Sequence, residues 1–181
     1  MQEPYKSIYQ ADIQLVARCL ANEHRAQKEL YDRYQKAMFT LAYRISNSFE
    51  DAEEILQDAF ISAFRGLVNF KHESTLGAWI KTITVRTALK KTKHKWQAES
   101  IEDYQAEQDY INWGTEPVDP EYLEDIIQGL PPGYRSIFVL IEVEGYSHKE
   151  VAEMLNISVG TTKSQLFHAK KLLQKKLEQF K

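Results

Sequence analysis

Residues 130–173 read LPPGYRSIFVLIEVEGYSHKEVAEMLNISVGTTKSQLFHAKKLL, and they carry the clearest structural pattern in the chain. Two prolines open a first helical run, and a glycine ends it. Ser147 and Glu150 have the spacing of a capping box, which predicts a short second helix. Asn156 tolerates a left-handed turn, and Ser158 can cap a third helix. A short helix, a tight turn and a longer basic helix form the helix-turn-helix plan.

The predicted third helix carries five lysines and no acid between Val159 and Lys176. The N-terminal part of such a helix enters the major groove, where Lys can donate to guanine and Ser or Gln can bond base edges. Lysines further along would meet phosphates. The alternative is a solvated helix whose C-terminal lysines only complement its dipole. For Lys175 and Lys176 the pattern does not decide, whereas for residues 163–168 it favours DNA contact.

Residues 1–96 are also predicted to be helical. Apolar residues recur at steps of three and four over 30–45, and again over 52–64. Ser48, followed by several carboxylates, is typical of a helix start. Residues 82–85 are β-branched and would suit a strand, but the length without a turn signal favours helix. The chain is therefore expected to be all-α.

The charge of the chain is segregated along its length. Its 181 residues carry 23 Lys and Arg against 26 Asp and Glu, a net charge of −3. Residues 1–96 hold 15 basic and 11 acidic residues, residues 97–125 hold ten acidic and none basic, and residues 126–181 hold 8 basic and 5 acidic. Two basic blocks around an acidic one can mark nucleic-acid contact.

The acidic segment 97–125 is expected to link two helical domains, 1–96 and 126–181. It has repeated carboxylates, glycine and proline but no sustained periodicity, and its self-repulsion favours an extended chain. Three aromatic residues within it suggest that part of the segment docks on something.

A second basic cluster, which includes Arg86, Lys90 and Lys91, follows Trp79 and the polar loop 71–74. Cations near such a loop suit single-stranded nucleic acid, whose phosphates need positive charge and whose unstacked bases need a pocket. A surface helix end with Trp79 in the core explains the same pattern. For Trp79 the core is favoured, and for the basic residues the two interpretations stay open.

No constellation of residues predicts catalysis, a metal or a cofactor. The acidic run 50–58 has no histidine at ligand spacing and no glycine-rich phosphate loop beside it. Asp51, Glu54 and Asp58 share one helix face, which is either solvated or a docking surface for a basic partner. The single cysteine, Cys19, excludes an internal disulfide and a thiolate cluster. No stretch approaches the ~20 apolar residues of a membrane span, and the N-terminus lacks a signal-peptide pattern, so we expect a soluble, cytoplasmic protein.

The chain resembles, nearly end to end, bacterial RNA polymerase sigma factors of the extracytoplasmic-function (ECF) group. The stretch 130–173 looks like the promoter-reading helix-turn-helix of that group. FEDAEEILQDAFISAFRGLVNF (49–70) and STLGAWIKTITVRTALKK (74–91) resemble its N-terminal domain. Either half alone could belong to another regulator, but both in this order with this linker make the resemblance specific.

The resemblance implies roles for three sets of residues. Those implied to read the −35 element are Thr161, Lys163, Ser164, Gln165, Phe167, His168, Lys170 and Lys171. Those implied to capture and flank the melting −10 strand are Lys71, His72, Glu73, Ser74, Arg86, Lys90 and Lys91. Those implied to dock on the polymerase clamp helices are Asp51, Glu54, Gln57, Asp58 and Ile61. The linker would thread towards the active-site and RNA-exit channels, where its carboxylates can imitate nucleic acid.

Three residues depart from the usual pattern of the group. Gln165 and His168 stand where Arg is common, which predicts a weaker grip on phosphate and an altered −35 preference. Arg86 stands where Asn is common, which affects the −10 base preference. The resemblance implies core polymerase and promoter DNA, as duplex and melted strand, as partners. No zinc-binding or membrane extension is attached, so we expect any signal to arrive through a separate anti-sigma protein.

Two other functions are consistent with parts of the sequence. A helix-turn-helix repressor or activator would bind duplex alone, usually as a dimer on a palindrome. An enzyme with an appended DNA-binding module would need a catalytic constellation, which the sequence does not present. The prediction is therefore a transcription initiation factor that is not an enzyme.

Overall fold

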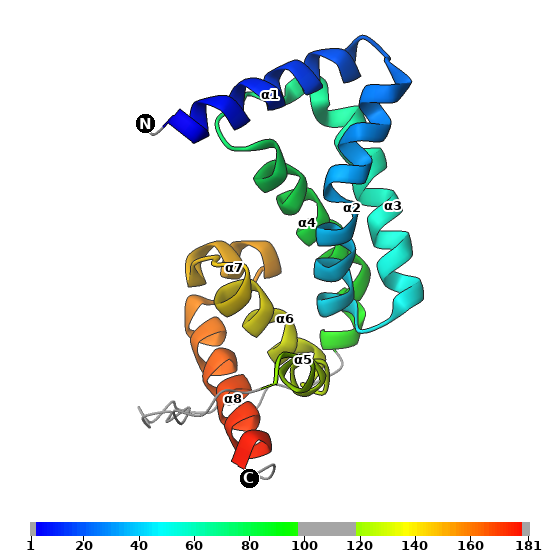
Figure 1. The fold of residues 1–181 in the computed structure, drawn as a ribbon. Helices are drawn as coiled ribbons and strands as arrows, with labels where there is room; N and C mark the ends of the chain where they lie inside the picture. The colour runs from blue at the N-terminus through cyan, green and yellow to red at the C-terminus, as the bar shows by residue number, and fades with distance from the viewer. Residues whose placement is uncertain (1–2, 98–118, 179–181) are drawn as a thin grey trace. The chain divides into compact units, whose positions relative to one another are not determined.

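The computed structural model describes residues 3–97 and 119–178, and within these ranges every regular element is helical (Figure 1). This confirms the all-α prediction. The elements in chain order are α1 (Glu3–Leu20), α2 (His24–Ser46), α3 (Phe49–Gly66), η1 (Leu67–Asn69), α4 (Leu76–Gln97), α5 (Pro120–Gln128), α6 (Pro132–Phe138), η2 (Val139–Val143), α7 (His148–Leu155) and α8 (Val159–Glu178).

The chain divides into two compact units, one built on most of α1 to α4 and the other on α5 to α8 together with residues 44–47 and the end of α4 from residue 92. Two helical domains were expected. The predicted linker 97–125 lies largely outside the described residues, but α5 begins within it. The Asp119 side chain accepts a hydrogen bond from the Glu121 N–H at 3.0 Å, and Pro120 occupies the first helical turn, where its missing N–H costs nothing.

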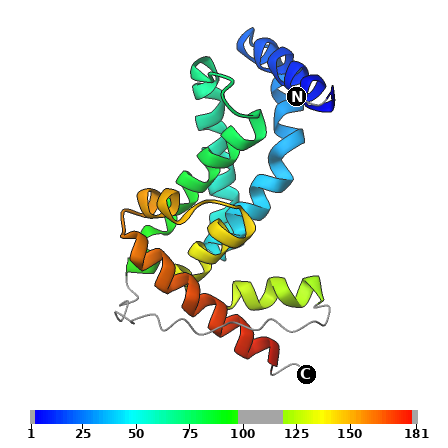
Figure 2. The same cartoon turned by 90° about the vertical axis from the view of Figure 1, so that its left-hand side faces the viewer.

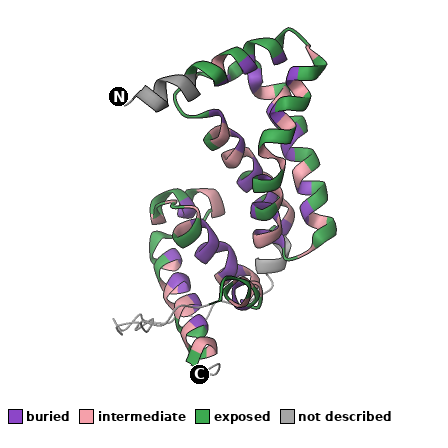
Figure 3. Cartoon of the chain, viewed as in Figure 1, coloured by how far each residue is buried: buried purple, intermediate pink, exposed green. Residues whose placement is uncertain are grey.

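The first unit has one core to which α1, α2, α3, η1 and α4 all contribute. Leu15 of α1, Leu30 of α2 and Ile80 of α4 are at most 2% exposed and belong to a single buried cluster. Buried stretches alternate with exposed ones along the helices, as expected for amphipathic helices around a shared core (Figure 3).

The β-branched residues at 82–85 lie in the middle of α4, so the helical prediction is confirmed. Thr82 and Thr84 each donate a hydroxyl hydrogen bond to the carbonyl four residues earlier, at 3.0 and 3.1 Å, and Thr87 does the same at 2.9 Å. These bonds satisfy the hydroxyls within the helix itself.

The second unit is organised around α8, which packs against α5, α6 and α7. Ile137, Leu140, Val151 and Leu173 are fully buried. Figure 2 shows α8 as the long orange-to-red helix of this unit, with α5 beside it. The Tyr122 hydroxyl of α5 donates to the Lys176 carbonyl at 3.1 Å.

The predicted caps of the helix-turn-helix are confirmed. Ser147 and Glu150 form a complete capping box at the start of α7. Asn156 follows that helix with φ 56°, in the left-handed region. Ser158 Oγ accepts the Thr161 N–H at 2.9 Å at the start of α8. Each of these bonds joins residues three apart, so the local sequence determines where both helices begin.

Candidate nucleic-acid interface

The first half of α8 presents a polar, basic surface. Lys163 is exposed, and Thr161, Ser164 and Phe167 are partly exposed. Thr162 and Leu166 point inward and are buried, because α6 and α7 cover that side of α8. The surface therefore starts at a helix end whose position Ser158 fixes.

Gln165 is placed differently from its neighbours. Its side chain is 1% exposed, so it faces the interior of the unit and is not brought together with Lys163. Its position follows from the helical repeat, because residue 165 lies one turn from the buried Thr162 and Ala169. The spacing within the sequence already contained this signal.

His148 and Thr162 connect α7 to α8 beneath the exposed surface. His148 Nδ1 lies 3.0 Å from Thr162 Oγ1. Burial lowers the pKa of His148, and the nearby Lys163 and Lys170 ammonium groups lower it further. The neutral imidazole is therefore favoured in the folded unit.

A cluster of rings lies further along α8. His168 stacks on Tyr134 of α6 with centroids 5.8 Å apart and meets Phe167 edge-on at 5.7 Å. Lys171 Nζ lies 5.1 Å from the Phe167 ring centroid, within reach of a cation–π interaction. Burial and the Lys171 charge lower the pKa of His168. His168 thus offers a stacking surface more than a fixed positive charge.

Lys170 is engaged within the unit. Its ammonium forms an ion pair of 2.7 Å with Glu142 of η2. Lys171 and Lys175 are exposed and line a hollow of about 510 Å³ together with Tyr134 and His168. Of the predicted lysines of α8, Lys163, Lys171 and Lys175 are thus the exposed ones.

In the first unit, the predicted −10 loop lies between η1 and α4. Lys71, Glu73 and Ser74 are exposed, while His72 is partly buried and has φ 57°. The His72 ring lies 4.6 Å from the Phe70 ring, centroid to centroid. Phe70 in turn packs 5.1 Å from Trp79, which is half-buried. The polar, exposed loop therefore lies next to the packed rings of Phe70 and Trp79.

The basic residues of α4 separate into two groups. Arg86 and Lys90 are exposed. Lys91 is hydrogen-bonded to Glu54 and lies 3.8 Å from Asp51, both on α3. The hydrogen bond with Glu54 raises the pKa of Lys91, and the neighbouring carboxylates add to this effect. Lys91 thus links α4 to α3.

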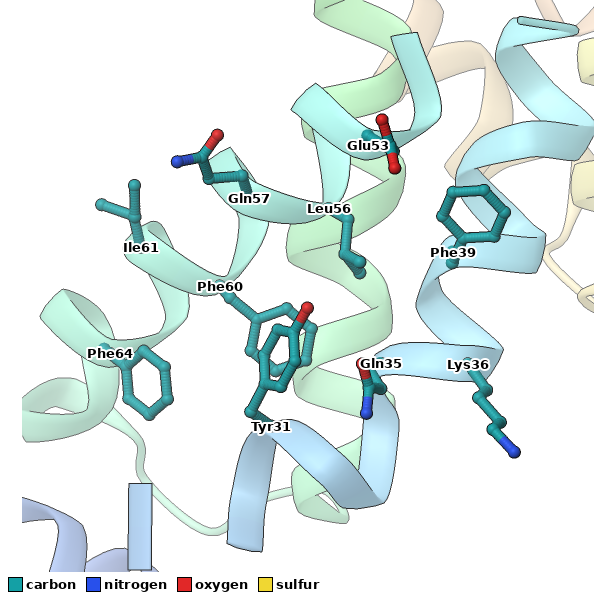
Figure 4. A pocket seen from close by; sticks show the side chains of 10 residues that line it. All are labelled: Tyr31, Gln35, Lys36, Phe39, Glu53, Leu56, Gln57, Phe60, Ile61 and Phe64. Carbon is teal, nitrogen blue, oxygen red and sulfur yellow. The ribbon is translucent and has the colours of Figure 1, made fainter. Parts of the chain in front are cut away.

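The five predicted docking residues lie along the outer side of α3. Glu54, Gln57, Asp58 and Ile61 are exposed, and Asp51 is partly exposed. Asp51 and Glu54 form one edge of this side, next to Lys91. Gln57 and Ile61 form the other edge, next to α2 (Figure 4).

A groove of about 700 Å³ runs between α2 and α3 (Figure 4). Its lining residues are Tyr31, Gln35, Lys36, Phe39, Glu53, Leu56, Gln57, Phe60, Ile61 and Phe64. The Tyr31 and Phe60 rings meet edge to face at 4.8 Å. The sequence interpretation missed the contribution of α2, although Tyr31, Gln35 and Phe39 recur every four residues and form a second stripe on that helix.

The described residues contain no group of three or more His, Cys, Asp or Glu side chains arranged to hold a metal. Across 3–97 and 119–178, no helix is both long and apolar enough to cross a membrane.

Known protein families match residues in both units. Residues 30–97 match the family model for Sigma-70 region 2, and residues 121–173 match the model for Sigma-70, region 4. The ECF RNA polymerase sigma-E factor of Haemophilus influenzae is 30% identical, with 92% of this chain and 95% of that protein covered. The chain belongs to the ECF RNA polymerase sigma factors. RNA polymerase sigma-H factor of Pseudomonas aeruginosa is 29% identical to this sigma factor, over 92% of this chain and 94% of that protein.

Solved structures share the fold of this sigma factor. The sigma factor RpoE of Bartonella quintana, solved in complex with the anti-sigma factor NepR, gives a TM-score of 0.53 at 22% identity, covering 83% of this chain and 96% of that one. CnrH, in complex with the cytosolic domain of CnrY, gives the same TM-score and identity, covering 93% and 97%. Family membership assigns this sigma factor to promoter-directed transcription initiation by RNA polymerase, as a regulatory subunit rather than an enzyme.

Proposed function

We propose that this sigma factor acts in the cytoplasm, where it docks on core RNA polymerase through α3, reads the −35 element through α8 and helps to open the −10 region through the loop before α4. The observation that carries the proposal is the exposed start of α8. There Lys163, Thr161 and Ser164 lie at a helix end that Ser158 caps. Side chains at this position of a helix-turn-helix reach base edges in the major groove.

The proposed −35 surface is smaller than the sequence implied. Gln165 is left out, because a side chain that is 1% exposed does not reach a base. Lys171 is suited to phosphate, because it lies on the exposed side of α8 farther from its capped start. Lys163 and Ser164 are therefore the proposed base-reading pair.

For the −10 region, the exposed loop over Phe70 and Trp79 supports a role in holding an extruded base. Extruding a base from the duplex costs a few kcal/mol, and stacking and hydrogen bonds in a pocket offset that cost. Arg86 and Lys90 are exposed on α4 and suited to the backbone of the melted strand. Lys91 is proposed to act at the junction of α3 and α4, since it is held by Glu54.

For polymerase docking, the outer side of α3 and the adjoining groove support a mixed polar and apolar interface. Ile61 is 41% exposed, and aromatic rings from two helices line the groove beside it. Large apolar side chains in such a groove are typical anchors of helix-in-groove binding, while Asp58 and Glu54 supply charge for a basic partner. We include an anti-sigma protein as a second partner, by analogy with the RpoE–NepR complex.

The −35 assignment is tested with Lys163→Ala, using Lys175→Ala as the matched control. Both remove an exposed lysine of α8. In binding assays across a library of −35 sequences, Lys163→Ala should lose discrimination worth about 1–3 kcal/mol. Lys175→Ala should leave the discrimination among −35 sequences unchanged. Uniform weakening by Lys163→Ala would make Lys163 a phosphate contact and refute the base-reading assignment.

The docking assignment is tested with Asp58→Arg, using Glu153→Arg as the control. Glu153 is an exposed acid on α7, so the charge change is the same in a different unit. Asp58→Arg should reduce assembly with core polymerase in a pull-down while binding to −35 duplex survives. Equal assembly of both variants would refute the docking surface.

A further inference from the structure

Asp12 of α1 is a buried acid for which the functions above have no use. Its side chain is 4% exposed, and it is the one carboxylate among the buried side chains of the described part of the chain. A carboxylate pays a large desolvation cost on burial unless charged or hydrogen-bonding groups surround it. Its partners therefore indicate what it does.

Two groups from different helices bind the Asp12 carboxylate. Oδ2 accepts the backbone N–H of Leu76, the first residue of α4, at 3.3 Å. Oδ1 pairs with Arg33 of α2 at 3.2 Å. One carboxylate thus connects α1, α2 and the N-terminal end of α4.

The bond to Leu76 lies at the end of the proposed −10 loop. Phe70 closes the other end, where its N–H bonds to the Leu67 carbonyl of η1 at 3.1 Å. Between the two ends, His72 is in the left-handed region and the residues around it have no regular structure. The place of the loop is thus set by its two ends.

The first turn of α4 has two caps of different origin. Thr75 Oγ1 accepts the Ala78 N–H at 3.2 Å, a local cap. Asp12 supplies the second cap from another helix, and its negative charge lies at the positive end of the α4 dipole. Thr75 shapes the first turn, whereas Asp12 fixes that turn relative to α1 and α2.

We infer that Asp12 is a positioning residue for the −10 loop: it anchors the start of α4, so that residues 71–75 are held in the arrangement that accepts an extruded base. This inference rests on the proposed function of the loop. Without Asp12 the loop is in its binding arrangement in only a fraction of molecules, and the apparent affinity for melted −10 DNA is the intrinsic affinity multiplied by that fraction.

The test compares Asp12→Ala with Asp32→Asn in the full chain assembled with core polymerase. Asp32 is an exposed acid of α2 that pairs with Lys28 on the same helix. The probe is a fork-junction DNA, from a promoter that the wild-type holoenzyme transcribes, whose −10 strand is single-stranded. Asp12→Ala should weaken this binding about tenfold, the effect of losing one hydrogen bond to a charged group. Asp32→Asn should not.

Three further measurements separate positioning from loss of fold. Binding to −35 duplex should be equal for both variants. Asp12→Asn, which keeps an acceptor but no charge, should bind the fork junction with intermediate affinity. Amide hydrogen exchange of Asp12→Ala should accelerate more at residues 76–79 than in the middle of α3, a pattern that uniform destabilisation would not give.

His72→Ala, measured on the same DNA, distinguishes the two levels of the proposal. If His72→Ala weakens fork-junction binding and Asp12→Ala does not, the positioning role is overturned and the loop assignment stands. If neither variant changes binding, the loop does not hold the base, and both the −10 assignment and the role of Asp12 are overturned.

Discussion

The start of α8 has a local cap, whereas the start of α4 has a remote cap in addition to its local one. Ser158 caps α8 from three residues away, inside the same turn. Asp12 binds the first N–H of α4 across 64 residues of chain. Both helices carry a surface proposed to contact DNA. The first depends on local turn chemistry and the second on the packing of a whole unit, so the two should respond differently to substitution.

The largest expected difference comes from Asp12→Ala. It leaves the Leu76 N–H buried without its acceptor and Arg33 without one of its partners, and should lower the free energy of unfolding by about 2–3 kcal/mol. Urea unfolding followed by circular dichroism measures this loss. If Asp12→Ala lowered the free energy of unfolding no more than Ser158→Ala does, the remote cap would contribute no more stability than the local one.

Asn156→Val should have the next largest effect. A β-branched residue at φ 56° is strained, which should destabilise the second unit by about 1–2 kcal/mol. Asn156→Gly is the matched control and should be close to neutral, because glycine adopts this conformation freely. Thermal unfolding of the pair measures the difference. Equal midpoints would mean that backbone conformation at the turn does not set the stability of the helix-turn-helix.

Ser158→Ala should cost about 1 kcal/mol, the usual value of a lost N-cap. The control is Ser164→Ala, which removes a hydroxyl that bonds to the Thr161 carbonyl inside the same helix. Its effect on chemical denaturation should be smaller. Should Ser164→Ala cost as much, the cap would not be what holds the start of α8.

The smallest effect expected is on the pH dependence of the second unit. Burial and nearby lysines lower the pKa values of His148 and His168 in the folded state. The unfolded chain therefore binds more protons, and stability should fall as the pH drops through about 6.5, the ordinary value of histidine. Unfolding midpoints at pH 7.5 and 5.5 measure this slope, and the double variant His148→Gln/His168→Gln should flatten it. An unchanged slope in that variant would contradict the assignment to these two residues.

The contrast between the two helix starts also explains what the sequence could predict. The capping box, the left-handed Asn156 and the Ser158 cap were predicted, because each rests on residues a few positions apart. At residues 82–85 the β-branched side chains favour a strand. Helix was predicted there because the segment is long and has no turn signal, and because the family resemblance supports helix. Thr82 and Thr84 satisfy their hydroxyls by bonds one turn back, which pattern reasoning did not consider.

Most of the features that sequence reasoning missed depend on contacts between distant elements. Asp12 stands in a part of the predicted helical block to which no role was assigned, and its importance comes from Leu76, far along the chain. The groove needs α2 and α3 side by side before its rings form a lining. The engagement of Lys91 by Glu54 depends on the packing of α4 on α3. Gln165 differs, since its burial follows from the helical repeat and could have been predicted.

The long-range bond of Asp12 also has a consequence for how the protein is made. During synthesis α1 leaves the ribosome first, but its carboxylate cannot meet the Leu76 amide until more than sixty further residues have emerged. Closing so long a stretch of chain costs entropy before any contact is gained, and folding slows as contact order rises. The caps of the helix-turn-helix join residues three apart, so they can form as soon as those residues have emerged. The nascent chain must therefore keep its first helices soluble until the fourth arrives.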